Sequence, residues 1–144
     1  MNEQDLNNRL KTVQDYQGSF AVNELNQVNL KYPTLFVVNL DERGDSGSHW
    51  IGVAIYMTDI YICDTLGGLL PNKKTAIEWQ YFLKLMVDNR RLVVTKRLSE
   101  KGLCGLYCVT FIKEMAKTNN FCEFLSLFSS DLSTNDTVVK FLNK

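Results

Sequence analysis

The sequence has little of several features that would assign a protein to a class at once. It holds one histidine and two prolines, and its sixteen basic residues balance its sixteen acidic ones. A neutral chain has no overall electrostatic reason to bind nucleic acid or an anionic membrane. Apolar runs stay below the roughly 18 residues of a membrane span, and the polar amino-terminal segment does not resemble a signal peptide. We therefore expect an intracellular protein without a nucleic-acid or membrane partner.

Composition and length favour one ordinary folded domain. Apolar residues make up 45% of the chain and charged residues 22%, which is close to the average for globular proteins. A chain of 144 residues has room for a single domain and is long enough to bury a real core. We expect one domain over residues 1–144.

The cysteines do not form a pattern that indicates disulfides or a metal. They stand at positions 63, 104, 108 and 122, without a C-x-x-C pair. In a reducing compartment four such cysteines are not a disulfide framework, and a single histidine makes a zinc site improbable. We expect no metal and no cofactor. Cys63 and Cys108 are interpreted as core residues, and Cys122 as more exposed.

Hydrophobic periodicity predicts a mixture of strands and helices. Helical spacing of apolar residues predicts helices over 2–14, 75–89 and 104–116, and shorter ones near 121–127 and 136–142. Compact apolar runs predict strands over 34–40, 49–56, 60–64 and 92–95. Residues 17–19 are interpreted as a turn, and 21–30 stays ambiguous. The order predicts an α+β fold, with a small mixed or antiparallel sheet flanked by helices.

The only histidine and an aspartate flank a predicted hairpin. His49 stands where the polar loop 41–48 enters one strand, and Asp64 ends the next strand. Antiparallel pairing brings such positions together at one edge of a sheet. A carboxylate there accepts a hydrogen bond from one imidazole nitrogen and leaves the other for a thiol.

A cysteine before a helix completes this candidate constellation. Cys104 follows a polar loop and begins a predicted helix, where the helix dipole lowers the pKa of a thiol. Gly105 leaves the backbone beside the sulfur without a β-carbon. The backbone N–H of Cys104 is a candidate donor to an oxyanion.

Each residue of this constellation also has a plain structural interpretation. A lone histidine, a free cysteine and an aspartate after a strand are individually more often structural than catalytic. Taken together, the arrangement of His49, Asp64 and Cys104 favours a catalytic triad.

Three short motifs resemble the adenovirus-type cysteine proteases (adenain), whose wider clan includes the ubiquitin-like-protein proteases. They are GSHWIG at 47–52, YICDTLGG at 61–68 and LCGLYC at 103–108. With GSFA at 18–21, the resemblance extends from about residue 18 to residue 116. It implies a small sheet flanked by helices and papain-like chemistry, with Trp50 lining the site.

The resemblance also implies a function. Enzymes of this type mature virion precursor proteins, so the expected partners are a protein substrate and an activating peptide, and the protein would be packaged in the virion or act in the host cytoplasm or nucleus. Two alternatives stay open: a protease that removes ubiquitin-like modifiers, and a non-catalytic binding module that keeps the fold.

One departure from the family concerns the oxyanion hole. The family has a glutamine six or seven residues before the nucleophile, where this chain has Arg97 and Leu98. Arg97 is a tentative replacement, because a guanidinium would suit an oxyanion. The other interpretation is an oxyanion hole built from backbone donors alone.

Overall fold

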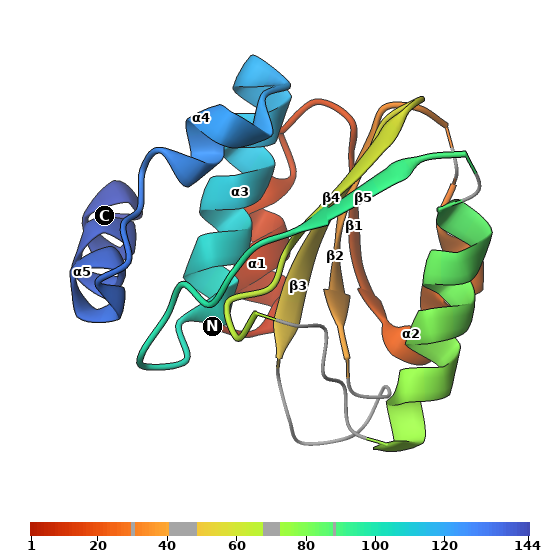
Figure 1. The fold of residues 1–144 in the computed structure, drawn as a ribbon, viewed down its shortest axis with the longest axis horizontal. Helices are drawn as coiled ribbons and strands as arrows, with labels where there is room; N and C mark the ends of the chain where they lie inside the picture. Colours follow the sequence, from red (N-terminus) through yellow and green to blue (C-terminus); the bar gives the residue numbers. More distant parts are fainter. Residues whose placement is uncertain (30, 41–48, 68–72, 88) are drawn as a thin grey trace.

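The computed structural model describes residues 1–29, 31–40, 49–67, 73–87 and 89–144, and this part of the chain forms a five-stranded mixed sheet (Figure 1). Its strands, in spatial as in sequence order, are β1 (Tyr16–Ala21), β2 (Thr34–Asn39), β3 (Trp50–Ile55), β4 (Asp59–Cys63) and β5 (Arg91–Val94). The central strands β2, β3 and β4 pair antiparallel, whereas β1 and β5 pair parallel at the two edges.

Helices cover both faces of this sheet. They are α1 (Glu3–Leu10), the 3-10 helix η1 (Val22–Gln27), α2 (Lys73–Met86), α3 (Cys104–Thr118), α4 (Phe121–Leu125) and α5 (Leu132–Leu142). Helix α2 lies on one face, α1 and α3 lie on the other, and α5 packs on the side of α3 away from the sheet (Figure 1). The α+β class expected from the sequence is confirmed.

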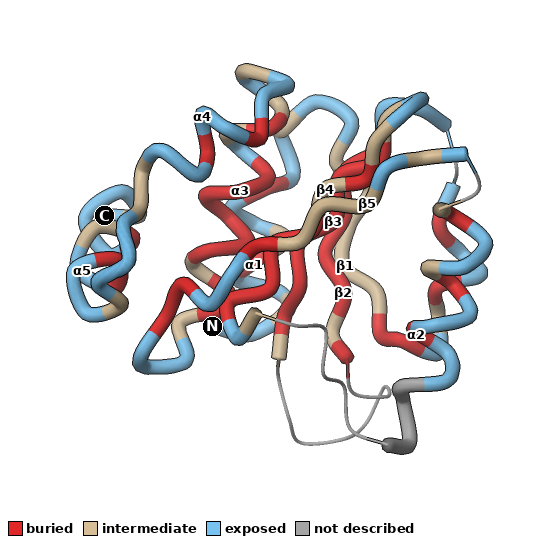
Figure 2. Tube along the Cα trace, in the orientation of Figure 1, coloured by how far each residue is buried: buried red, intermediate tan, exposed pale blue. Residues whose placement is uncertain are grey.

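The core is divided by the sheet into two apolar clusters (Figure 2). All six residues of β3 are buried, because the strand has helices on both sides. Helix α3 is buried along most of its length and packs against β2, β3 and β4. Phe111 approaches β3 so closely that a β-carbon added to Gly52 would stand 2.6 Å from its ring. The middle of α3 therefore packs directly on β3.

The four strands predicted from the sequence are confirmed within a residue or two, but other expectations change. The turn expected at 17–19 is wrong, because β1 runs through it; Gly18, with φ of 132°, lies where the pairing register shifts between Tyr16 and Ser19. A bulge in an edge strand and a turn share this residue type. The stretch 21–30, which the sequence left ambiguous, contains the 3-10 helix η1. The last helix begins at Leu132, not at Asp136. The polar loop 41–48 lies outside the described residues.

None of the four cysteines forms a disulfide bond. Cys63 and Cys108 are buried and Cys122 is exposed, as expected from the sequence. Among the described residues, no group of three or more acidic, histidine or cysteine side chains is placed to hold a metal ion. No helix in the described ranges has the length and apolar character that crossing a membrane requires.

Candidate active site

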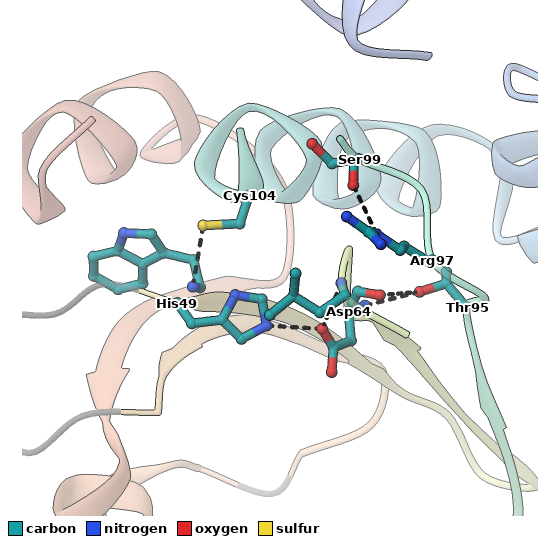
Figure 3. Close-up of polar contacts among 8 residues, drawn as sticks. His49, Asp64, Thr95, Arg97, Ser99 and Cys104 are labelled. Carbon is teal, nitrogen blue, oxygen red and sulfur yellow. Dashed lines mark hydrogen bonds and ion pairs between the residues drawn. The ribbon is translucent and has the colours of Figure 1, made fainter. Parts of the chain in front are cut away.

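The β3–β4 hairpin places the histidine and the aspartate beside each other. Gly52 pairs with Cys63 in the ladder, so His49 just before β3 and Asp64 just after β4 leave the sheet at the same edge. Nε2 of His49 lies 2.7 Å from Oδ1 of Asp64 (Figure 3). The structure therefore joins these two predicted site residues, and their catalytic role stays a prediction.

Asp64 is held from several directions. Its side chain is 1% exposed, and its Oδ1 also accepts a hydrogen bond of 3.1 Å from the backbone N–H of Leu66. Its backbone exchanges two hydrogen bonds with Thr95, whose hydroxyl accepts from the Asp64 N–H at 2.9 Å and donates to the Asp64 carbonyl at 2.8 Å (Figure 3). The carboxylate is consequently fixed in its orientation toward the imidazole.

Cys104 is the first residue of α3 and is buried, with 7% of its surface exposed. The backbone N–H of Trp50 donates to its Sγ at 3.4 Å (Figure 3). Burial raises the pKa of this thiol, but hydrogen bonds from His49 and from the backbone N–H groups of Trp50 and Gly105 outweigh burial and lower the pKa below its usual value. The thiol of Cys104 therefore ionises more readily than an ordinary cysteine.

The imidazole of His49 lies between the sulfur and the carboxylate (Figure 3). Burial lowers its pKa, but hydrogen bonds with Asp64 and with Cys104 raise the pKa to about 9. Because Nε2 faces Asp64, Nδ1 is the nitrogen left for the sulfur. A lowered thiol pKa beside a raised imidazole pKa favours an imidazolium–thiolate pair near neutral pH.

The helix start contributes to the same effect. Leu103 occupies the N-cap of α3, and its side chain makes no capping hydrogen bond. The sulfur of Cys104, the first residue of the helix, accepts a hydrogen bond from the backbone N–H of Gly105 in the first turn. The positive end of a helix dipole stabilises a thiolate there. The position of Cys104 at the start of a predicted helix indicates this environment from the sequence alone.

A cavity of about 550 Å³ opens beside Cys104, in the size range of ligand sites. One wall is the start of α3, from Gly102 to Leu106, and the opposite wall comes from α1 and the residues before it. Trp50 also lines the cavity, and its role in an active site stays a prediction. Its indole Nε1 is buried and has no hydrogen-bond partner in the described part of the chain.

The two remaining tentative residues have different positions. Gly105 lies in the site: its N–H contacts the sulfur, and an added β-carbon would stand 3.1 Å from Sδ of Met1. Arg97 does not line the cavity that contains Cys104. Its Nε donates to the backbone carbonyl of Ser99 at 3.2 Å (Figure 3). Arg97 borders a second cavity of about 500 Å³. This geometry gives no support to Arg97 as an oxyanion donor.

Sequence reasoning missed Thr95 as a residue that holds the site. It comes directly after β5, which pairs in parallel with β4 through Ile62 and Val94. In this register Thr95 stands opposite Cys63, the residue before Asp64, and its hydroxyl reaches the backbone of Asp64. A hydroxyl residue at the carboxyl end of a strand that neighbours the aspartate strand was the available signal.

No protein-family model and no curated protein matches the chain. Solved structures do: the ASFV pS273R protease aligns with a TM-score of 0.59 and 15% identity, over 95% of this chain and 63% of that one. HopZ1a in complex with IP6 and CoA aligns with a TM-score of 0.51 and 12% identity, over 85% of this chain and 41% of that one. The central domain of the uncharacterized Lpg1148 protein from Legionella pneumophila aligns with a TM-score of 0.50 and 13% identity, over 99% and 93%.

Identities this low show a shared fold and nothing finer. The chain spans 63% of the length of the ASFV protease, which has regions without a counterpart here. The likeness supports a cysteine-protease type of fold and is not specific to adenain. The chain therefore has the α+β fold of the ubiquitin-like proteases.

Proposed function

We propose that the chain is a cysteine endopeptidase in which Cys104 is the nucleophile, His49 the general base and acid, and Asp64 the residue that orients the imidazole. The observation that supports this most is the hydrogen-bonded series from Asp64 through His49 to Cys104, the last of which lines a cavity. These are the roles that a thiolate nucleophile, its base and an orienting acid take in acyl transfer.

The reaction then runs in two acyl-transfer steps. The thiolate of Cys104 attacks the scissile carbonyl carbon, and the imidazolium of His49 gives its proton to the departing amine, which leaves a thioester on the sulfur. Water next attacks the thioester while the imidazole takes its proton. The acid product leaves, and the imidazolium–thiolate pair is restored.

Backbone donors would replace the family's glutamine at the oxyanion. The N–H of Trp50 already points at Sγ from 3.4 Å, and the carbonyl oxygen of a bound substrate would lie next to that sulfur. The backbone N–H groups of Trp50 and Cys104 together supply two donors, the usual number in an oxyanion hole. Loss of a side-chain donor in such holes costs about 10²–10³ in turnover, so a slow enzyme is expected.

For the substrate we propose virion precursor proteins, cleaved during maturation. The support is the resemblance of the His-Trp and Cys-Gly motifs to adenain and the fold shared with a protease of ASFV. The cavity beside Cys104 has the volume to hold several residues of an extended peptide.

The test is to incubate the purified protein with the structural precursor proteins of its own source genome and to map new termini by mass spectrometry. Cys104→Ala should remove every cut, whereas Cys122→Ala, which deletes an exposed thiol, should leave them unchanged. Intact precursors after incubation with the wild-type protein would reject this substrate.

Removal of ubiquitin-like modifiers is the second candidate, favoured by the fold class itself. It uses the same residues and differs only in substrate. Vinyl-sulfone probes of ubiquitin and its relatives should then label Cys104, and labelling should disappear in Cys104→Ala. Cleavage of precursors without any probe labelling would favour the maturation protease.

A further inference from the structure

A second buried carboxylate, unused by the mechanism above, lies on the far side of the nucleophile helix. Asp136 is 3% exposed in the second turn of α5. Its Oδ1 accepts from the hydroxyls of Ser99 and Tyr107, each at 2.7 Å, and its Oδ2 accepts from the backbone N–H groups of Glu100 and Lys101, each at 3.0 Å. Four donors on one buried carboxylate are a built arrangement, since burial of an ionised group without them is costly.

Three of these donors belong to the connection between β5 and α3, which leads directly into the nucleophile. Ser99, Glu100 and Lys101 stand three to five residues before Cys104. Ser99 also accepts a hydrogen bond of 3.5 Å from the N–H of Leu103, the N-cap of α3. The carboxylate therefore fixes the backbone that delivers the first turn of this helix.

The other end of the same connection is tied to the aspartate of the candidate triad. The hydroxyl of Thr95 bonds the backbone of Asp64, and the N–H of Leu98 donates to the carbonyl of Thr65 at 3.0 Å. The connection thus has one anchor beside Asp64 and another on Asp136. Its geometry determines how far the start of α3 stands from the imidazole.

The fourth donor locks the helix itself. Tyr107 lies in the first turn of α3, three residues after Cys104, and its side chain is fully buried. Its hydroxyl is 2.7 Å from Oδ1 of Asp136 and 3.3 Å from the carbonyl of Leu98. The neighbouring Asn135 donates to that same carbonyl at 3.1 Å. Helix α5 therefore holds both the connection and the helix that it enters.

We propose that Asp136 is a positioning residue for Cys104: by binding Ser99, Glu100, Lys101 and Tyr107 it sets the sulfur within hydrogen-bonding reach of His49. This rests on the proposed function, in which Cys104 is the nucleophile. Helix α5 acts through this contact as a clamp on the active site from outside the catalytic residues. A shift of the first turn of α3 away from the imidazole would make the thiolate of Cys104 less stable relative to the thiol.

Asp136→Asn is the sharpest substitution, because it keeps the size of the side chain. Its amide oxygen can still accept from the two hydroxyls, but its NH₂ group would face the N–H donors of Glu100 and Lys101. These two backbone N–H groups would then face another donor instead of an acceptor. They would lose their hydrogen-bond partner, and the connection between β5 and α3 would move away from α5. Asp131→Asn is the matched control, since it makes the same change on the same helix at an exposed N-cap, where asparagine accepts equally well.

The readout is the rate of alkylation by iodoacetamide as a function of pH, measured at Cys104 by peptide mass spectrometry in the folded protein, with Cys122 as internal standard. We expect Asp136→Asn to move the Cys104 profile to higher pH and to slow its alkylation near neutral pH about tenfold, the effect of roughly one pKa unit. Cys122 and the Asp131→Asn variant should match the wild type.

An unchanged Cys104 profile in a folded Asp136→Asn protein would overturn the inference and leave the proposed function standing. If wild-type Cys104 already reacts no faster than Cys122, the proposed function fails and the inference with it. Should Asp136→Asn not fold, Ser99→Ala and Tyr107→Phe each remove one donor. We expect each to shift the profile in the same direction by less, and wild-type profiles in both would equally reject the proposal.

Discussion

Nε2 of His49 and Oδ1 of Asp64 lie 2.7 Å apart although fifteen residues separate them along the chain. The hairpin between them makes this contact, and the burial of Asp64 protects it from water. The carboxylate determines which ring nitrogen is left for Cys104 and favours the charged form of the imidazole. The predictions below depend on this contact and on its connection to the helix that carries the sulfur.

Asp64→Asn should preserve the fold and lower turnover. The amide keeps the size of the carboxylate but loses its charge, so the imidazolium is less stable and the orientation of the ring is less certain. We expect kcat to fall by roughly 10²–10⁴-fold, the range that general acid–base groups contribute, with a smaller change in KM. Steady-state kinetics on a cleaved precursor peptide would measure this. Asp59→Asn, at the partly exposed start of the same strand, should keep the turnover of the wild type, and equal losses of turnover in the two variants would contradict the assignment.

The pH dependence of kcat/KM should be bell-shaped. The lowered pKa of Cys104 sets the acid limb, so activity appears as the thiol ionises below its usual pKa. The raised pKa of His49, about 9, sets the alkaline limb, because above it the imidazolium that protonates the leaving amine is lost. The Asp64→Asn variant should move the alkaline limb to lower pH. A flat profile from acid to neutral pH would be incompatible with this ionisation scheme.

Gly67→Ala should destabilise the protein more than Gly102→Ala. Both glycines have positive φ, 64° and 69°, so both substitutions carry the same left-handed backbone cost of about 1–2 kcal/mol. Only at Gly67 would the new β-carbon clash, at 2.4 Å from the backbone nitrogen of Arg97; space is open at Gly102. We expect an additional loss of about 1–3 kcal/mol for Gly67→Ala in urea unfolding. Equal free energies of unfolding would show that the turn after Asp64 yields easily.

Acid should weaken the fold through Asp136. Burial raises the pKa of this carboxyl, but the hydrogen bonds from Ser99, Tyr107 and two backbone N–H groups lower the pKa below the usual 3.8. A carboxyl with a depressed folded-state pKa stabilises the protein above its unfolded pKa and loses that contribution as pH falls through the folded pKa. Urea unfolding at a series of pH values below 5 should therefore show a shallower loss for Asp136→Asn than for wild type. Parallel curves would mean that the carboxylate contributes nothing to the pH dependence.

Much of the site follows from local sequence signals. Strong alternating and β-branched runs predicted β2, β3 and β4, and a short turn between two strands leaves little freedom in their pairing. The positions of His49 and Asp64 at one edge follow from that pairing. Cys104 at the start of α3 follows from the polar loop and the apolar helix after it. These are short-range relationships, and a single sequence carries them.

Longer-range relationships could not be read in this way. The sequence does not predict the edge strand β1, because a glycine such as Gly18 is typical both of a bulge and of a turn. The sequence predicts that Asp136 begins a helix, whereas it lies inside α5 on the side that packs against α3. An aspartate among the apolar positions of that helix, with Leu132 and Val139, was the signal. Arg97 donates to the carbonyl of Ser99, two residues further on, and does not line the cavity that contains Cys104; its distance from Cys104 in the sequence does not predict this.

The account depends most on the ionisation of Cys104, and titration of thiolate absorbance in the ultraviolet measures it directly. The reference is the Cys122→Ala protein, which lacks the exposed thiol, and it is compared with the same protein carrying Cys104→Ser or His49→Ala. Burial raises the pKa of Cys63 and of Cys108 well above 9, so these two thiols stay protonated in the range that is titrated. We predict that the reference protein has a thiolate that forms below pH 9, that adding Cys104→Ser removes it, and that adding His49→Ala returns its pKa toward the ordinary value. A reference curve that rises only at or above pH 9, unchanged by His49→Ala, would contradict the proposed ionisation of Cys104.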